Sequence, residues 1–260
     1  MKRSFSGGLL AVLIGVACID SNAQVCGISA SKLNVPDASV ISIETFEFEP
    51  SINVFHSSSQ FGEDGKTEPL GGKSVSSDLL FRVTASVSER LEIGTAFSRA
   101  LEQIDVGSKL LVFNSEKIKL AAIAGLSIPA GNKFISDLSD EQETYFGGTL
   151  GGIASFEAGT SSSVDASVSF SHYTGNRLNK RIWCGLSYGT YVSQNLQLIG
   201  ELGGFYLFDK NYSESKFNCA GGFSYKVTSG LILVMGFQYD LFGRNTWKGA
   251  GYQTAFTMLF

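Results

Sequence analysis

Side chains suited to nucleophilic or acid–base chemistry are few in this sequence. It contains two histidines, His56 and His172, and His172 directly follows Ser171. A serine hydrolase needs a serine and a histidine that a third group orients. The strand pattern below puts His172 on the outward side and Ser171 on the inward side, and no orienting acid or amide is identified. We therefore predict no enzymatic activity, with a rim-sited lipid hydrolase only as a third hypothesis, and we expect His56 in the first surface loop.

Metal and nucleotide sites are equally unsupported. The acidic stretch from Asp137 to Glu143 could bind a divalent cation, but a solvated loop is the commoner meaning of such a run. The glycine pairs 147–148 and 151–152 do not follow a strand and open a helix, so they are not phosphate loops, and we expect them to give room for close packing. The four cysteines show no CxxC or Cys/His spacing, so the sequence supports neither a metal site nor a disulfide framework. We predict no cofactor.

Composition narrows the class of protein. The 260 residues carry a net charge of −4, and 17% are charged, against roughly 25% in soluble domains. A mildly acidic chain does not suit nucleic acid as a partner. Because 43% of the residues are hydrophobic and 12% are aromatic, the chain has ample material for burial and is not disordered.

The amino end resembles an export signal. Lys2 and Arg3 precede an apolar run of about 11 residues from Leu9, followed by small residues up to Ala23. A membrane-spanning helix would need about 18 or more. We predict a signal peptide at 1–23 with cleavage after Ala23, and the alternative is a lipoprotein signal with acylation of Cys18. Residues 24–40 would then be a periplasmic or plug segment, and 41–260 one barrel domain.

From residue 41 onward apolar and polar residues alternate with period two, as in β-strands with two different faces. The stretch 163–171 is typical, since Val164, Ala166, Val168 and Phe170 alternate with aspartate and serines. About twelve strands are predicted, with the count uncertain by two because the 91–113 hairpin is compact. Pro50 cannot donate a ladder hydrogen bond, so we expect a bulge or an early strand end there. The predicted strands are 41–55, 78–88, 91–99, 104–113, 117–128, 145–157, 163–173, 181–192, 196–208, 216–227, 231–242 and 250–260.

Connection lengths favour a membrane barrel. Short turns alternate with longer connections at 56–77, 129–144, 174–180, 209–215 and 243–249, and only 100–103 breaks the series. Strands of about 9–11 residues with short turns on one side and long loops on the other are typical of an all-β, transmembrane antiparallel up-and-down barrel. The alternative is a soluble β-sandwich or lipocalin-like barrel. Its outer face would be rich in charge, whereas the polar set here is mostly serine, glycine and threonine.

Aromatic residues gather near the ends of the predicted strands, as in the two girdles of outer-membrane barrels. We assign Phe55, Trp183, Tyr206 and Phe242, among others, to the girdle on the long-loop side. The final strand ends in Phe260, which resembles the signal read by the bacterial barrel-assembly machinery. The predicted location is the bacterial outer membrane, with its lipid and that machinery as partners.

Charges on the inward side of the strands are the candidate functional residues. A charge facing lipid at mid-depth costs about 2–4 kcal/mol for Arg or Lys, so a wall charge should face water or a partner. These residues either line a pore or pair across the lumen and brace or plug it, because a twelve-strand barrel is narrow. Arg82, Lys109 and Glu201 lie nearest mid-strand. The candidate pore-lining residues are Glu47, Glu49, Arg82, Glu92, Asp105, Lys109, Lys119, Asp165, Glu201 and Asp240.

Two stretches resemble a known family. They are the hairpin 81–94, FRVTASVSERLEIG, and the segment 124–131, AGLSIPAG, which resembles an apolar strand closing on Pro-Thr-Gly with Ala130 in place of the threonine. Over about residues 45–260 the sequence resembles the transporter-type outer-membrane proteins labelled "MetA-pathway of phenol degradation". The resemblance implies a transport role and no catalytic residues.

The sequence thus leaves two main hypotheses. The first is an outer-membrane channel, or porin, for passive diffusion of small solutes, apolar or aromatic ones among them. The second is a closed structural barrel whose surface loops, 56–77 and 129–144, bind a partner.

Overall fold

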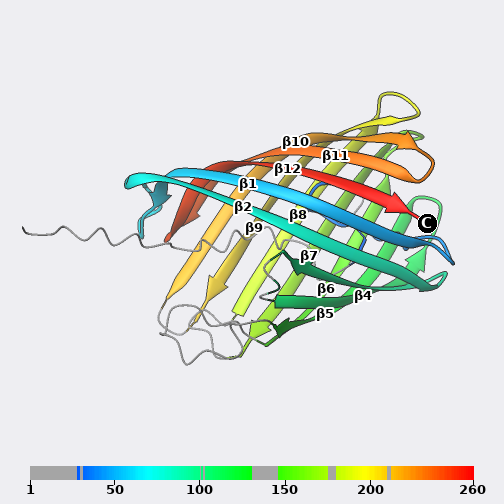
Figure 1. Cartoon of the computed structure of the whole chain (residues 1–260), viewed down its shortest axis with the longest axis horizontal. Coiled ribbons are helices and arrows are strands. Elements are labelled where there is room, and N and C mark those ends of the chain that lie inside the picture. The colour runs from blue at the N-terminus through cyan, green and yellow to red at the C-terminus, as the bar shows by residue number, and fades with distance from the viewer. Residues whose placement is uncertain are drawn as a thin grey trace, which may run out of the picture.

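The computed structural model describes residues 28–29, 32–99, 101, 103–130, 146–174, 180–209 and 212–260. Twelve antiparallel strands form one closed barrel in which each strand pairs with its sequence neighbours and β1 pairs with β12 (Figure 1). The predicted fold class is confirmed. The described residues contain no helix long and apolar enough to cross a membrane.

The strands have the following bounds: β1 Phe46–Phe61, β2 Thr67–Ser88, β3 Leu91–Ser98, β4 Gln103–Asn114, β5 Ile118–Pro129, β6 Gly147–Glu157, β7 Ser162–Tyr173, β8 Lys180–Tyr191, β9 Leu196–Phe208, β10 Ser213–Thr228, β11 Leu231–Arg244 and β12 Thr246–Leu259.

The period-two pattern is the reason these segments form a barrel wall. On β7 the outward residues Val168 and Phe170 are 53% and 44% exposed, whereas inward Asp165 and Ser167 are 1% and 6% exposed. The outer face is therefore apolar and the inner face polar, the reverse of a soluble protein and the arrangement that suits lipid outside.

The first long loop was predicted wrongly. The strand β1 continues to Phe61 and β2 already begins at Thr67, so only residues 62–66 form the turn between them. His56 therefore lies within β1 and not in a loop. The predicted loop at 243–249 is a tight turn at Asn245, with φ 53°. These extensions are polar because they project beyond the apolar band, which makes them resemble loops in sequence.

Pro50 neither ends β1 nor forms a bulge against β2, because the β1–β2 register is continuous from Phe46 to Ser57. On the β12 side the pairing skips positions 49 and 50 and resumes at Ser51 with Ala255. The missing donor of Pro50 is thus accommodated by a short gap in one ladder.

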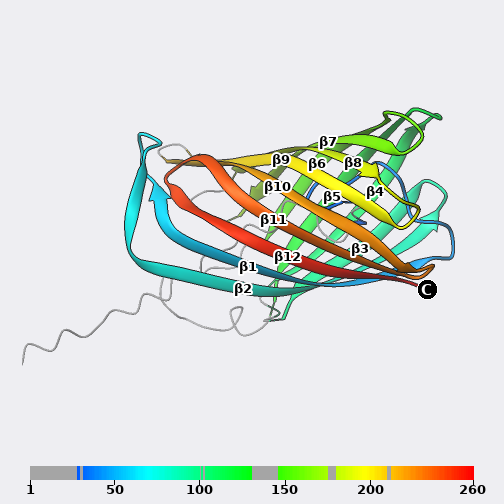
Figure 2. The ribbon, with the colours of Figure 1, turned by 90° about the horizontal axis from the view of Figure 1, so that it is seen from above.

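The barrel wall is uneven in height. The strands from β9 through β12 to β2 run on past the long-loop ends of β3 to β7, and the β1–β2 hairpin reaches furthest (Figures 1 and 2). The carboxyl end of the chain lies at the opposite, short-turn side. The tall half of the wall places additional inward residues at the long-loop mouth.

The aromatic girdle was predicted correctly in part. Tyr206 and Phe242 are 45% and 68% exposed on the outer face. Trp183, however, is 5% exposed and packs against Phe205 inside the barrel, and Phe55 also occupies an inward position. A position near the end of a strand does not by itself identify a girdle residue, because the side chain must also face outward, away from the lumen.

Candidate functional site in the barrel lumen

All ten candidate charges lie at strand positions that face the interior. Asp105 and Lys119 are half-buried, and the other eight are at most 8% exposed. Such burial within a polar interior means that other protein atoms surround these side chains. The elements that supply those atoms decide what the interior can do.

The main occupant of the interior is the chain that precedes β1. Residues 28–29 and 32–42, here called the luminal segment, lie inside the barrel and contact its wall through side chains and backbone N–H groups. Ile28, Leu33, Val35 and Ala38 are each at most 3% exposed. Three anchors built on buried carboxylates, hydrogen bonds of Ala38 with Ser155 and of Ser39 with Lys119, and three apolar contacts hold the segment.

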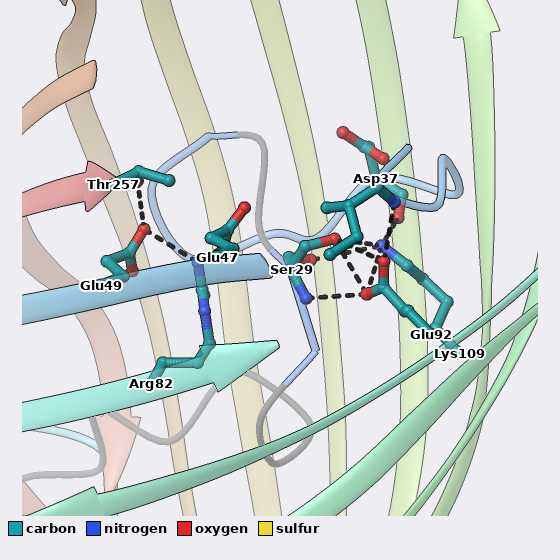
Figure 3. A network of polar contacts seen from close by, with 9 residues as sticks. Ser29, Asp37, Glu47, Glu49, Arg82, Glu92, Lys109 and Thr257 are labelled. Carbon is teal, nitrogen blue, oxygen red and sulfur yellow. Dashed lines mark hydrogen bonds and ion pairs between the residues drawn. The ribbon is translucent and has the colours of Figure 1, made fainter. Parts of the chain in front are cut away.

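The first anchor joins β3 and β4 to both ends of the segment (Figure 3). Glu92 accepts hydrogen bonds from the backbone N–H of Ser29 at 2.8 Å and of Ile41 at 3.1 Å. Lys109 lies 3.1 Å from the Glu92 carboxylate and donates to Ser29 Oγ at 2.9 Å and to the carbonyl oxygen of Asp37 at 3.2 Å. Both charges are fully buried, so each compensates the desolvation of the other.

The second anchor is an ion pair between the segment and β7. Lys32 Nζ contacts the carboxylate of Asp165 and also donates to the carbonyl oxygen of Ser163 at 3.2 Å. Ser187 on β8 donates to the same carboxylate at 3.2 Å. Removal of either charge would leave the other buried alone, which is strongly unfavourable.

The third anchor is a carboxylate held almost entirely by backbone. Glu201 on β9 accepts from the N–H groups of Leu33, Asn34 and Val35 at 3.0, 2.8 and 3.3 Å, and from Asn34 Nδ2 at 3.3 Å. Within the described part of the chain this carboxylate has no ion-pair partner, although it is 5% exposed. Successive N–H groups that converge on one carboxylate form a nest-like anion site, here contributed by the segment itself.

Apolar side chains of the segment fit three patches on the wall. Ile28 and Ala38 pack on β5 and β6, Leu33 packs on a patch that includes Ile199 of β9 and Val234 of β11, and Val35 packs on Trp183 and Phe205. Glycines in the wall provide the room. A Cβ at Gly236 would lie 2.8 Å from Leu33 Cδ2, and one at Gly189 would lie 2.6 Å from Lys32 Cε.

A separate cluster braces the junction where the barrel closes (Figure 3). Arg82 on β2 lies 2.8 Å from both Glu47 and Glu49 on β1. Thr257 on β12 donates to Glu49 at 2.5 Å. These residues connect β12, β1 and β2, so their contacts stabilise the wall.

The remaining predicted charges contact either the wall or the segment. Asp240 on β11 lies 3.5 Å from Lys216 and accepts from the N–H of Gly249. Lys119 donates to Ser39 Oγ at 3.1 Å, and Asp105 accepts from Gln103. Five of the ten candidates, Glu92, Lys109, Lys119, Asp165 and Glu201, thus contact the luminal segment, and the others contact the wall.

No catalytic or metal constellation forms among the residues that the structure describes. His172 is exposed on the outer face, whereas Ser171 is 6% exposed inside and lies 2.7 Å from the Thr149 hydroxyl. No group of three His, Cys, Asp or Glu side chains could hold a metal there. The acidic stretch 137–143, Ala23 and Cys18 lie outside the described residues.

Sequence reasoning missed the residues of the luminal segment that complete these anchors, Ser29, Lys32 and Asn34. It also missed Arg181 and Lys216 on the inner wall. The glycines in the wall opposite the segment could not have predicted its position from the sequence, because a glycine in a strand equally often marks a bend or a bulge.

Comparisons with known proteins agree with this architecture. No protein-family model matches the sequence, and no curated protein matches it. Among solved structures, the COG4313 outer membrane channel from Pseudomonas putida F1 superposes with a TM-score of 0.74 at 15% identity, over 86% of this chain and 98% of that one. The NanC porin gives a TM-score of 0.55 at 7% identity over 81% and 98% of the two chains, and the KdgM porin in complex with oligogalacturonate gives 0.52 at 9% over 82% and 98%. The chain therefore has the fold of outer-membrane β-barrel channels.

Proposed function

We propose that this protein is an outer-membrane channel for passive diffusion of small solutes and that the luminal segment closes it at rest. The observation that carries the proposal is the segment itself, which occupies the interior of a channel-type barrel. A structural barrel could fill its lumen with wall side chains alone. Here the filler is a separate piece of chain with its own contacts, and such a piece can leave without disturbing the wall ladder.

The wall supports this division of roles. Arg82, Glu47 and Glu49 connect strands of the wall, whereas Glu92, Asp165 and Glu201 hold the segment. If the segment leaves, the latter three carboxylates face water in a polar lumen, where a charge is tolerated. They then become pore-lining groups, as proposed for them from the sequence. The open state has mixed charge and weak ion selectivity.

Passive diffusion needs neither a cofactor nor catalysis, and we propose that the protein is not an enzyme. His172 faces outward, which favours a place in the aromatic girdle. Ser171 hydrogen-bonds with Thr149, which favours a structural role in the wall. We further propose that the mature protein, residues 24–260, is folded into the outer membrane by the barrel-assembly machinery.

Single-channel conductance in planar bilayers tests the proposal. The refolded protein, residues 24–260, is compared with a variant that lacks residues 28–42, and a variant that lacks the turn residues 63–65 serves as control. We expect rare steps in the parent and in the control and frequent discrete steps in the variant without the segment. Heat-shifted gel mobility confirms in each case that the barrel is folded.

Folded protein with no steps in any variant would overturn the channel proposal. That result would favour a closed barrel that works through its surface, and the projecting β1–β2 hairpin would be its first candidate. Deletion of residues 57–76 would then abolish binding of a partner while the barrel still folds.

A further inference from the structure

One row of inward polar residues crosses five neighbouring strands, from β5 to β9. The antiparallel register places these residues directly opposite one another from strand to strand. We call the set the cross-strand row: Lys119, Ser155, Asp165, Ser187 and Glu201. Neighbouring strands lie about 4.8 Å apart, so the Cα atoms of the two acidic residues, with Ser187 between them, are separated by roughly 10 Å.

The two acids of the row depend on the luminal segment for their partners. Four other inward acids pair with cations of the wall: Glu47, Glu49, Glu92 and Asp240. Asp165, in contrast, pairs with Lys32 of the segment, and Glu201 has no ion-pair partner among the described residues. The cation of the row, Lys119, lies two strands from Asp165 and four from Glu201. Departure of the segment therefore leaves two negative charges together on β7 and β9.

The segment itself shows what these two carboxylates bind. The Lys32 ammonium group contacts the Asp165 carboxylate and donates to the carbonyl oxygen of Ser163 at 3.2 Å. The backbone N–H of the next residue, Leu33, donates to Glu201 at 3.0 Å. The two nitrogens are joined by the Lys32 carbons Cε, Cδ, Cγ, Cβ, Cα and C. The segment thus bridges the carboxylates with a short carbon chain that has a nitrogen at each end.

The strand between the carboxylates leaves room for such a chain. On the inner face of β8, Ser187 has Gly185 and Gly189 on either side. A Cβ at Gly189 would lie 2.6 Å from Lys32 Cε, so the Lys32 side chain occupies space that this glycine provides. Ser187 also donates to the Asp165 carboxylate at 3.2 Å, which fixes its position. Since all these groups belong to the wall, the room and the carboxylates remain when the segment leaves.

We propose that Asp165 and Glu201 form a binding site for small linear diamines in the open channel. A diamine carries an ammonium group at each end of an alkyl chain. One ammonium group replaces that of Lys32 on Asp165 and Ser163, and the other replaces the backbone N–H groups on Glu201. Two carboxylates within a low-dielectric wall also raise the local concentration of cations.

This inference rests on the proposed function, because the site becomes available when the luminal segment leaves. The diamine and the segment are then alternative occupants of the same two carboxylates. A ligand that binds one of two states shifts the population toward that state. The diamine therefore opens the channel that it enters, and Lys32 acts as an internal competitor.

Calorimetry measures the binding without reference to conductance. The probe is hexamethylenediamine, whose nitrogens are separated by as many carbon atoms as Lys32 Nζ and Leu33 N. Hexylamine, with one ammonium group, and hexanoate, with the opposite charge, are the comparison ligands. Each is titrated into the refolded protein, residues 24–260, and into the variant that lacks residues 28–42. This deletion removes no strand residue, and heat-shifted gel mobility confirms that the barrel is folded.

Substitutions in the variant without the segment test the two carboxylates. Hexamethylenediamine should bind this variant about ten-fold more tightly than hexylamine, the contribution of one further charged contact. Asp165→Asn and Glu201→Gln should each remove this advantage. Glu49→Gln should keep it and is the matched control, because Glu49 pairs with Arg82 of the wall. Equal affinities for the diamine and hexylamine, or equal losses in Glu49→Gln and Glu201→Gln, would overturn the inference.

The parent chain supplies a second measurement that does not need the deletion. Trp183 packs on Val35, so departure of the segment should expose its ring to acrylamide. With the second tryptophan removed by Trp247→Phe, hexamethylenediamine should increase the quenching of Trp183 more than hexylamine does. No increase would contradict the competition between diamine and segment.

The two proposals fail in different ways. Diamine binding with the expected dependence on Asp165 and Glu201, but without conductance in any variant, would refute the channel and leave the row as a ligand site. Conductance without diamine binding would refute this inference and leave the channel.

Discussion

Neutralising Glu201 should release the luminal segment. Each Glu201 oxygen accepts two hydrogen bonds, Oε1 from the N–H groups of Leu33 and Val35 and Oε2 from the two donors of Asn34. In Glu201→Gln one of these oxygens becomes an NH2 group, which is itself a donor and cannot accept the hydrogen bonds of the N–H groups that it faces. The change leaves two donors without an acceptor and weakens the other two hydrogen bonds, because the acceptor is no longer charged.

The size of the effect follows from typical values. Hydrogen bonds to a charged acceptor contribute about 1.5–3 kcal/mol each, and those to a neutral one about 1 kcal/mol. The amide is less costly to bury than the carboxylate, which offsets part of the loss. A net change of about 2 kcal/mol against the closed state remains, which corresponds to about a 30-fold shift in the closed-to-open ratio.

Two assays report this shift independently. Open probability in planar bilayers should rise, and Trp183, which loses its contact with Val35, should become more accessible to acrylamide in a Trp247→Phe background. The control is Glu49→Gln, because that carboxylate is also buried in the lumen but its partners among the described residues, Arg82 and Thr257, belong to the wall. If Glu201→Gln folds and neither readout differs from that of Glu49→Gln, the segment is not held by this anchor and the reasoning fails.

Two other predictions concern the same segment. Gly236→Leu should displace Leu33 and raise open probability, whereas Gly200→Ala, which places a Cβ in open space, should not, and equal conductance of the two variants would contradict the steric argument. Lys32→Met leaves Asp165 buried without its cation, a loss of about 3–5 kcal/mol when one partner of such a pair is removed. It should therefore open the channel more than the double variant Lys32→Met/Asp165→Asn does, and single-channel recordings of both would show it.

The wall could be predicted from sequence because the period-two pattern is a local property. The alternation within each strand identifies its inner and outer face, as Asp165 and Val168 do on β7. A count of about twelve strands, uncertain by two, and the inward direction of all ten candidate charges therefore follow without long-range information. The ends of β1 and β2 could not be predicted, because a strand outside the apolar band no longer needs an apolar face. The alternation disappears there although the pairing continues.

The contacts of the luminal segment could not be predicted from the sequence, for a different reason. The hydrogen bond from Leu33 to Glu201 spans 168 positions, and that from Ser29 to Glu92 spans 63. Nothing in the composition of 28–42 distinguishes a segment inside the barrel from one outside it. The sequence left open whether the inward charges line a pore or pair within it, and in the structure five of the ten contact the luminal segment.

The unequal strand lengths leave one edge of the sheet open to a neighbour. The strand β3 pairs with β2 only from Leu80 to Ser88, so the projecting part of β2 before Asp78 has no strand beside it on that side within the described structure. Such an edge is a template on which another chain can add a strand and begin to aggregate. The sequence protects it, because Pro69 removes a donor, the Gly71–Gly72 pair disfavours regular extension, and Lys73 places a charge on the edge. The polar end of β2 would then have a second consequence, since it keeps neighbouring copies of the protein from pairing edge to edge.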